Sequence, residues 1–270
     1  MAISKKTNTI ILTGLMMALT TVATMAIAVP VPFTNGYIHL GDSMIFLSVL
    51  ILGWKYGAIA AGVGSAMADI FLGYVHWAPW TLCIKGLMAV MMGLLIQKTA
   101  GDPKRTAIAV SVIAAFWLAF HFIVNRIILH EGTNNPSALL SEEVADLSAL
   151  GVFLNGMQSQ LMLVALLIPI FLGVIALVIR KREHFVLPLS QILGMTLAGL
   201  VMVFGYYIAG GIMYGNFAVS AFSIPANMIQ FAIGFLVAAL LVAALSKTPV
   251  EKYFAIRIQR QHQRSPSFSK

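Results

Sequence analysis

Charged residues and cysteine are scarce in this sequence. Of its 270 residues, 10% are charged and 60% are hydrophobic, whereas soluble domains are about 25% charged and about 45–50% apolar. A mean hydropathy of +0.92 excludes an ordinary soluble domain and a disordered chain. The single cysteine, Cys83, excludes a disulfide framework and a multi-cysteine metal site. These exclusions leave an all-α protein that crosses the membrane several times.

Motifs of nucleotide hydrolysis and of common hydrolases are also missing. The chain has no G-x-x-x-x-G-K-[ST] loop, so it is not itself an ATPase. It has neither an H-E-x-x-H nor a G-x-S-x-G motif. His121 and His130 are too widely spaced to indicate a strong metal site. We therefore expect no catalytic residue, no cofactor and no metal ion.

Long apolar segments are what the sequence does contain. A helix needs about 20 apolar residues to cross the hydrocarbon core of a bilayer. Eight candidates are residues 10–31, 40–53, 57–74, 79–96, 106–129, 157–179, 189–212 and 222–245. The second candidate is short, so we expect it to be tilted or partly re-entrant.

Lysine and arginine fall on one side of this eight-span arrangement. They occupy the start of the chain, alternate connections and the tail: Lys5, Lys6, Lys55, Lys98, Lys104, Arg105, Arg180, Lys181, Arg182, Lys247, Lys252, Arg257, Arg260, Arg264 and Lys270. The opposite loops hold Glu131, Glu142, Glu143 and Asp146. Cytoplasmic loops carry an excess of Lys and Arg, so we expect both termini in the cytoplasm. The same rule accounts for the net charge of +8 without invoking nucleic acid.

Three segments need a separate interpretation. The start of the chain resembles a signal peptide, but its apolar run exceeds the usual ~7–15 residues, so we expect it to be retained as a span. Residues 131–156 read as an outer loop in which residues 141–146 form a short surface helix. The basic tail, residues 247–270, suits anionic lipid headgroups better than RNA, because it follows a membrane span.

Asp69 is the most informative ionisable residue within the predicted spans. Gly57, Ala61, Ser65, Asp69 and Gly73 recur every four residues and therefore share one helix face. Small residues allow helices to approach closely. We therefore expect Asp69 to face the interior of the bundle, in the outer third of its span.

Lys85 falls at a similar depth in the next predicted span. A carboxylate and an ammonium group at matching depth can pair, which lowers the cost of burying both. We therefore expect Asp69 and Lys85 to pair, either as a structural bridge or as part of a substrate cavity. Asp42 opens the second span, where it is expected to cap the helix.

Aromatic and amide residues gather at the same predicted level. Trp77 and Trp80 lie between the third and fourth spans, as interfacial anchors or as a wall for a ring-shaped ligand. Asn227 and Gln230 share a face of the last span and can bond a polar ligand or a neighbouring helix. Tyr206, in the seventh span, is either an anchor or a ligand contact.

Several runs resemble the substrate-binding S component of energy-coupling factor (ECF) vitamin importers, in the riboflavin-type branch. The resembling runs are Ile38-His-Leu-Gly-Asp42, Gly53-Trp-Lys-Tyr-Gly57, Gly62-Val-Gly-Ser-Ala-Met-Ala-Asp69, Ile84-Lys-Gly86, Gly205-Tyr-Tyr207 and Ser223-Ile-Pro-Ala-Asn227. Gly14 and Ala18 resemble the small-xxx-small motif with which S components contact the coupling subunit.

The resemblance implies a six-helix core. Residues 1–100 would supply its first four helices and residues 189–246 its last two, with residues 101–188 as an inserted hairpin. The resemblance further implies that the chain binds a scarce vitamin from outside. It would then join a membrane coupling subunit and two cytoplasmic ATPases, reorient in the cell membrane and release the vitamin inside.

Together, these observations define an expected substrate site. Its residues are Asp69, Lys85, Asn227 and Gln230, with Trp77, Trp80 and Tyr206 as aromatic contacts and Asp42 as a further candidate. Riboflavin, a thiamine precursor, pantothenate and a corrinoid suit these residue types alike. Two other functions remain open: a proton-coupled secondary transporter with Asp69 as proton carrier, and a membrane enzyme using His121 and His130.

Overall fold

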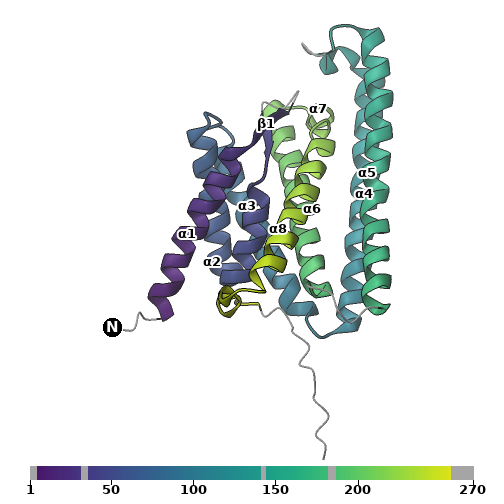
Figure 1. The fold of residues 1–270 in the computed structure, drawn as a ribbon. Helices are drawn as coiled ribbons and strands as arrows, with labels where there is room; N and C mark the ends of the chain where they lie inside the picture. Colours follow the sequence, from purple (N-terminus) through teal and green to yellow (C-terminus); the bar gives the residue numbers. More distant parts are fainter. Residues whose placement is uncertain (1–4, 32–35, 141–143, 182–186, 257–270) are drawn as a thin grey trace, which may run out of the picture.

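The computed structural model describes residues 5–31, 36–140, 144–181 and 187–256. Its main helices form a bundle with a two-stranded hairpin at one end (Figure 1). The longer helices are α1 (Lys5–Ala26), α2 (Gly41–Phe71), α3 (Ala78–Thr99), α4 (Pro103–Asn134), α5 (Leu147–Lys181), α6 (Leu189–Tyr214) and α8 (Ile224–Leu245). The shorter elements are β1 (Ala28–Val31), β2 (Gly36–His39), η1 (Pro136–Leu139), α7 (Phe217–Ala221) and η2 (Pro249–Tyr253).

Helix α2 is bent back on itself at Gly53, where φ is +74° and ψ is 174°. Only glycine adopts such a conformation without strain. A straight helix of 31 residues would be about 46 Å long, yet Asp42 and Asp69, near its opposite ends, both interact with Lys85. Helix α2 therefore consists of two arms, residues 41–52 and 54–71.

Seven helices of the described chain are long and apolar enough to cross a membrane, and α2 counts as one of them. Its two arms correspond to the second and third of the eight predicted segments. The first arm has only twelve residues, about 18 Å of helix, against a hydrocarbon core of about 30 Å. The prediction of a short second segment is thus confirmed, although the segment joins the third in one bent helix.

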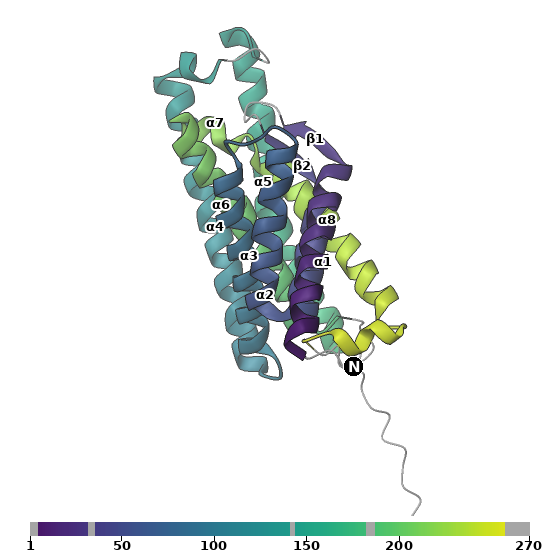
Figure 2. The same cartoon turned by 90° about the vertical axis from the view of Figure 1, so that its left-hand side faces the viewer.

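The bend in α2, the α3–α4 connection and the end of α8 lie at the same end of the bundle as the start of α1 (Figures 1 and 2). Backbone bonds tie this end together, because the N–H groups of Ala255 and Ile256 donate to the carbonyls of Ile51 and Leu50. We call it the terminal end. The opposite end, where β1 and β2 lie, is the hairpin end.

Strands β1 and β2 follow α1 directly and pair antiparallel, with Ala28 opposite His39 and Val31 opposite Gly36. The first predicted segment, residues 10–31, therefore ends in a strand rather than in helix. Between the hairpin and the terminal end, α1 packs closely against the second arm of α2. The Thr21 hydroxyl of α1 donates to the Gly64 carbonyl of α2 over 2.8 Å, and a side chain at Gly64 would lie 2.6 Å from the Met17 carbonyl oxygen.

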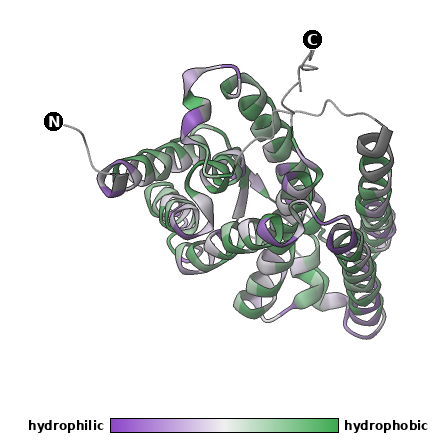
Figure 3. Cartoon of the chain, turned by 90° about the horizontal axis from the view of Figure 1, so that it is seen from below, coloured by the Kyte–Doolittle hydropathy of each residue, from purple (hydrophilic) through white to green (hydrophobic). Residues whose placement is uncertain are grey.

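Helices α4 and α5 form a pair beside the other helices, as the view from below shows (Figure 3). The Trp117 indole of α4 donates to the Val164 carbonyl of α5 over 3.2 Å. Because α4 extends to Asn134 and α5 begins at Leu147, the expected loop over residues 131–156 is wrong in extent. The surface helix expected at residues 141–146 is not found in its described part, since residues 144–146 are not helical; a short helix, η1, lies earlier, at Pro136–Leu139. Residues 141–143 lie outside the described residues, as do tail residues 257–270.

Candidate functional site

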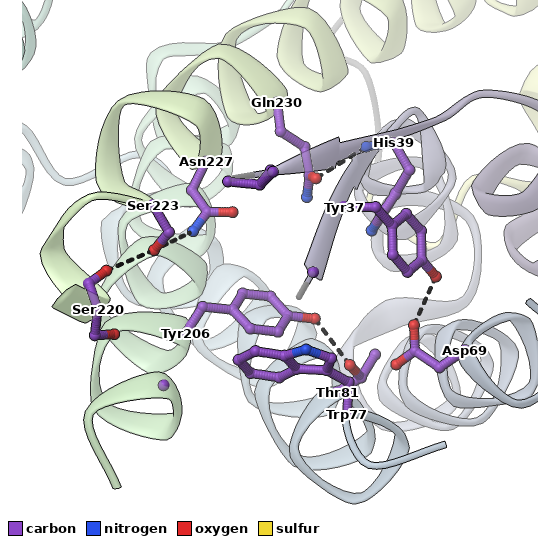
Figure 4. A pocket seen from close by; sticks show the side chains of 13 residues that line it. Tyr37, His39, Asp69, Trp77, Thr81, Tyr206, Ser220, Ser223, Asn227 and Gln230 are labelled. Atoms are coloured by element: carbon purple, nitrogen blue, oxygen red, sulfur yellow. Dashed lines mark hydrogen bonds between the residues drawn. The ribbon is translucent and has the colours of Figure 1, made fainter. Parts of the chain in front are cut away.

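A cavity of about 40 Å³ lies inside the hairpin end of the bundle (Figure 4). Seven elements, β1, β2, α2, α3, α6, α7 and α8, contribute to its wall, together with the residues just before α3 and α8. The lining residues are Val31, Gly36, Tyr37, His39, Asp69, Trp77, Thr81, Tyr206, Gly210, Ser220, Ser223, Asn227 and Gln230. Such a volume holds only a few water molecules, so a larger ligand requires the surrounding groups to move apart.

Tyr37 and Asp69 connect the hairpin to the second arm of α2. The Tyr37 hydroxyl donates to Asp69 Oδ1 over 2.6 Å, and the Tyr37 ring packs on Tyr74, with 4.6 Å between centroids. Burial, and then the hydrogen bond to Asp69, raise the pKa of Tyr37 well above its usual value. The phenol therefore stays neutral and continues to donate to the carboxylate.

Trp77, Thr81 and Tyr206 form the wall between α3 and α6. The hydroxyls of Thr81 and Tyr206 lie 3.0 Å apart and share a hydrogen bond. Trp77 meets the Tyr206 ring edge-on, with 5.6 Å between centroids. This part of the wall therefore presents aromatic rings whose polar atoms lie close to the cavity.

Ser220, Ser223 and Asn227 line the side formed by α7 and the start of α8. Asn216 places α7 by accepting hydrogen bonds from the N–H groups of Ala218 and Val219. The Ser223 hydroxyl then donates to the Ser220 carbonyl over 2.8 Å, and Asn227 Nδ2 donates to the Ser223 hydroxyl over 3.4 Å. Hydroxyl and amide groups on this side can bond a polar ligand atom.

A fully buried ion pair joins Lys85 to Asp42 next to the cavity. Lys85 Nζ contacts Asp42 Oδ1 at 2.5 Å, and both side chains are 0% exposed. Gln230 Nε2 donates to Asp42 Oδ2 over 2.8 Å. The expected pair of Lys85 with Asp69 is therefore wrong, because the first arm of α2 brings Asp42 to Lys85. Asp42 is also not the N-cap of α2, which is Leu40; its carboxylate bonds Lys85 and Gln230 instead.

His39 links the hairpin to this ion pair. Its backbone N–H donates to Gln230 Oε1, and its Nδ1 accepts from the Gly41 N–H, each over 3.0 Å. An acceptor Nδ1 places the proton of the neutral ring on Nε2. Burial, reinforced by the positive charge of Lys85, lowers the pKa of His39 to about 3.

The structure brings most of the expected site residues together. Asp69, Trp77, Tyr206, Asn227 and Gln230 line the cavity. Lys85 and Asp42 lie behind this wall and do not line it. Trp80 does not line it either and packs against the cluster around Trp77. The prediction that the Asp69 face of its helix points inward is confirmed for Gly57, Ala61, Ser65 and Asp69, which are all buried. Gly73 does not belong to this face, because α2 ends at Phe71 and Gly73 is exposed in the turn that follows.

Eight lining residues were not expected as site residues, and five of them have polar side chains: Tyr37, His39, Thr81, Ser220 and Ser223. His39 lies within the run Ile38-His-Leu-Gly-Asp42 that carries the family resemblance, so a signal for it existed. Tyr37 sits in a four-residue strand too short for a clear hydrophobic alternation. Ser223 likewise lies within the resembling run Ser223-Ile-Pro-Ala-Asn227. A serine such as Ser220 in an apolar segment gives no signal of its own, because it readily bonds nearby backbone groups.

No cluster of three or more His, Cys, Asp or Glu residues that could hold a metal ion occurs among the described residues. His121 is buried against the Trp117 ring, with 4.4 Å between centroids. His130 lies nine residues further along α4, about 13.5 Å along the axis, and its ring contacts Asn134. The two histidines therefore share no site.

Gly14 and Ala18, the expected partner contacts, both lie exposed on α1. A side chain built at Gly14 would meet no atom within 4 Å. In the described structure, this face of α1 is thus uncovered by the rest of the chain.

Comparison with known proteins identifies the family. The model of the family described as "ECF-type riboflavin transporter, S component" matches residues 4–143 and 145–247. The match includes α4 and α5, so it does not distinguish these two helices from the rest of the family fold. That residues 101–188 are an inserted hairpin therefore stays a prediction. A protein of Pyrococcus woesei, described as "Uncharacterized protein in gap 3'region", is 47% identical over 79 residues, which are 29% of this chain and 53% of that protein.

This chain thus spans about half the length of the curated relative that it matches. The family match, in contrast, covers nearly the whole bundle and both walls of the cavity. Together with the seven helices able to cross a bilayer, it shows that the chain is a multi-pass protein of the cell membrane and belongs to the family of S components of ECF-type riboflavin transporters.

Proposed function

We propose that this chain is the substrate-binding subunit of an ECF-type ABC importer for a vitamin or a related micronutrient. The observation that carries the proposal is the cavity at the hairpin end, where polar side chains from distant parts of the sequence meet inside an apolar bundle. Polar groups in a membrane span are costly. Binding of a ligand explains the presence of these polar side chains better than a contribution to the stability of the fold does.

The hairpin end is proposed to face outward. The basic residues Lys6, Lys55, Lys98 and Lys104 belong to the start of α1, the bend in α2 and the α3–α4 connection, all at the terminal end. Since Lys and Arg mark cytoplasmic loops, the cavity would open toward the outer surface. Both termini would then lie in the cytoplasm.

The partners follow from the family. A membrane coupling subunit and two cytoplasmic ATPases would complete the importer, because this chain has no nucleotide-binding loop. The exposed Gly14 and Ala18 on α1 are the proposed contact with the coupling subunit, since small residues let a partner helix approach closely. In this proposal the chain binds the substrate and reorients in the membrane, and it catalyses no reaction.

Equilibrium binding to the purified full-length chain tests the proposal. B vitamins and their precursors are titrated while tryptophan fluorescence is recorded, because Trp77 lines the cavity. We expect one compound to quench the fluorescence saturably, and Trp77→Phe to remove most of the quenching. Trp80→Phe is the matched control, since Trp80 lies nearby but does not line the cavity.

Two results would contradict the proposal. The first is a folded protein that binds no compound of the panel. The second is cellular uptake that continues without the ATPase subunits and stops when the proton gradient collapses. The second result would select a proton-coupled transporter, with Asp69 as its proton carrier.

A further inference from the structure

We infer that the ligand of this cavity is a cationic nitrogen heterocycle, held by the Asp69 carboxylate and the aromatic rings of Tyr37 and Trp77. The inference rests on the proposed function and names the chemical class of its substrate. It draws on three properties of the cavity. The Asp69 carboxylate is incompletely paired, the described wall contains no lysine or arginine, and aromatic rings face the cavity.

Asp69 supplies the negative charge. Its side chain is 4% exposed, and its Oδ1 accepts from the Tyr37 hydroxyl. Its Oδ2 is buried without a hydrogen-bond partner among the described residues. The nearby Thr81 hydroxyl interacts with this carboxylate and shares a hydrogen bond with the Tyr206 hydroxyl in which either group can be the donor. A buried carboxylate that is only partly satisfied is costly, and a ligand cation would offset that cost.

The described wall of the cavity does not provide the missing positive charge. None of the described residues lining the cavity is a lysine or an arginine. Lys85, the cation beside it, is committed to Asp42 and is 0% exposed. The ring of His39 accepts from the Gly41 N–H at Nδ1, which requires the neutral form. An anionic ligand would therefore meet the charge of Asp69 with no free cation to compensate.

Aromatic faces favour the same ligand class. Tyr37, Trp77 and Tyr206 all line the cavity (Figure 4). The negative face of such rings attracts cations, most strongly when water is excluded, and flat rings also stack well on them. Lys85 Nζ already lies over the Tyr206 ring, 5.3 Å from its centroid, so Tyr37 and Trp77 are the rings offered to a ligand cation. Ser223 and Asn227, on the opposite wall, can bond a neutral polar substituent of the ligand. The cavity thus combines one anionic contact with aromatic walls.

The test compares three probes that differ in charge. Thiamine carries a fixed positive charge on a ring, riboflavin is a neutral ring system, and pantothenate is an anion. Binding of each to the purified full-length chain is measured by titration calorimetry. We expect thiamine to bind at least about tenfold more tightly than the other two. We expect Asp69→Asn to weaken thiamine binding by about 10- to 100-fold, the usual loss for a hydrogen bond to a charged group.

Asn at position 69 can still accept from Tyr37, so the substitution removes charge but keeps the shape and this hydrogen bond. Ser65→Ala is the control, because Ser65 is buried one turn away on the same face and does not line the cavity. If Asp69→Asn does not yield folded protein, the order of the three affinities in the unsubstituted chain still decides.

Each outcome has a separate meaning. Tight binding of riboflavin or pantothenate with no binding of thiamine would overturn this inference and leave the proposed importer intact. Thiamine binding that Asp69→Asn leaves unchanged would also overturn it. A folded chain that binds none of the three probes would count against both the inference and the proposed function.

Discussion

Lys85 forms its ion pair with Asp42, at 2.5 Å, although Lys85 also interacts with Asp69. The two carboxylates therefore have different roles. Asp42 neutralises the buried lysine outside the cavity wall, whereas Asp69 remains at the wall, where its Oδ2 has no hydrogen-bond partner among the described residues. Gln230 joins the two regions, because it bonds Asp42 and also lines the cavity.

We predict that Lys85→Met destabilises the folded protein by about 3–5 kcal/mol, because it leaves Asp42 as an uncompensated buried charge. The double substitution Asp42→Asn with Lys85→Met should recover most of this loss, since it removes both charges. Thermal unfolding in detergent measures both effects. A double variant no more stable than Lys85→Met would show that the pair does not behave as one electrostatic unit.

Acid should destabilise the hairpin end through His39. Its pKa is lowered from 6.5 to about 3 in the folded chain, so between these values the unfolded chain binds more protons. The stability contributed by neutral His39 is therefore complete above pH 6.5 and is lost progressively as the pH falls toward 3, by up to about 1.4 kcal/mol per pH unit.

His39→Asn should flatten this part of the stability profile, because an amide oxygen can replace Nδ1 as acceptor for the Gly41 N–H and does not titrate. Unfolding temperatures recorded from pH 8 to pH 4 measure the slope for both proteins. Equal slopes would mean that other groups govern the loss in acid.

Gly14→Leu should uncouple transport from binding. A side chain at Gly14 has free space within the chain, so folding and ligand affinity should stay unchanged. Close approach of a partner helix would be blocked, and we expect uptake to fall by about tenfold or more, the effect of losing a central interface contact. Uptake assays in cells, paired with binding to purified protein, separate the two effects.

Gly173→Leu is the matched control for that substitution. Gly173 is likewise exposed with open space around it, but it lies on α5. Full uptake by this variant and reduced uptake by Gly14→Leu would support the α1 contact. Equal uptake by the two variants would refute it.

Gly53→Ala should destabilise the chain by about 1–3 kcal/mol, because φ of +74° with ψ of 174° is strained for any residue with a side chain. Space is not the cause, since an added Cβ would meet nothing within 4 Å. Gly173→Ala, in regular helix, should be neutral or slightly stabilising. Thermal unfolding of both variants checks the contrast, and equal unfolding temperatures would show that the bend tolerates a side chain.

Much of the fold was predictable because the length of an apolar segment is a local property. The predicted segment 79–96 became α3 at Ala78–Thr99, and segment 189–212 became α6 at Leu189–Tyr214. The boundaries of α4 and α5 were harder to predict. Polar residues such as His130 and Asn134 continue α4 beyond its apolar run, since hydrogen bonding within the helix does not require apolar side chains.

The sequence by itself determined that this chain is a helical membrane protein, which apolar segments it uses, and that Asp69 faces inward, because hydropathy and helical periodicity are encoded locally. The tertiary structure alone decided which carboxylate neutralises Lys85. That choice depends on the backward bend at Gly53 and on the placement of the first arm of α2 against α3 and α8. It also decided that Tyr37 and His39 of the hairpin enter the cavity, because contacts between distant segments arise only when the helices pack.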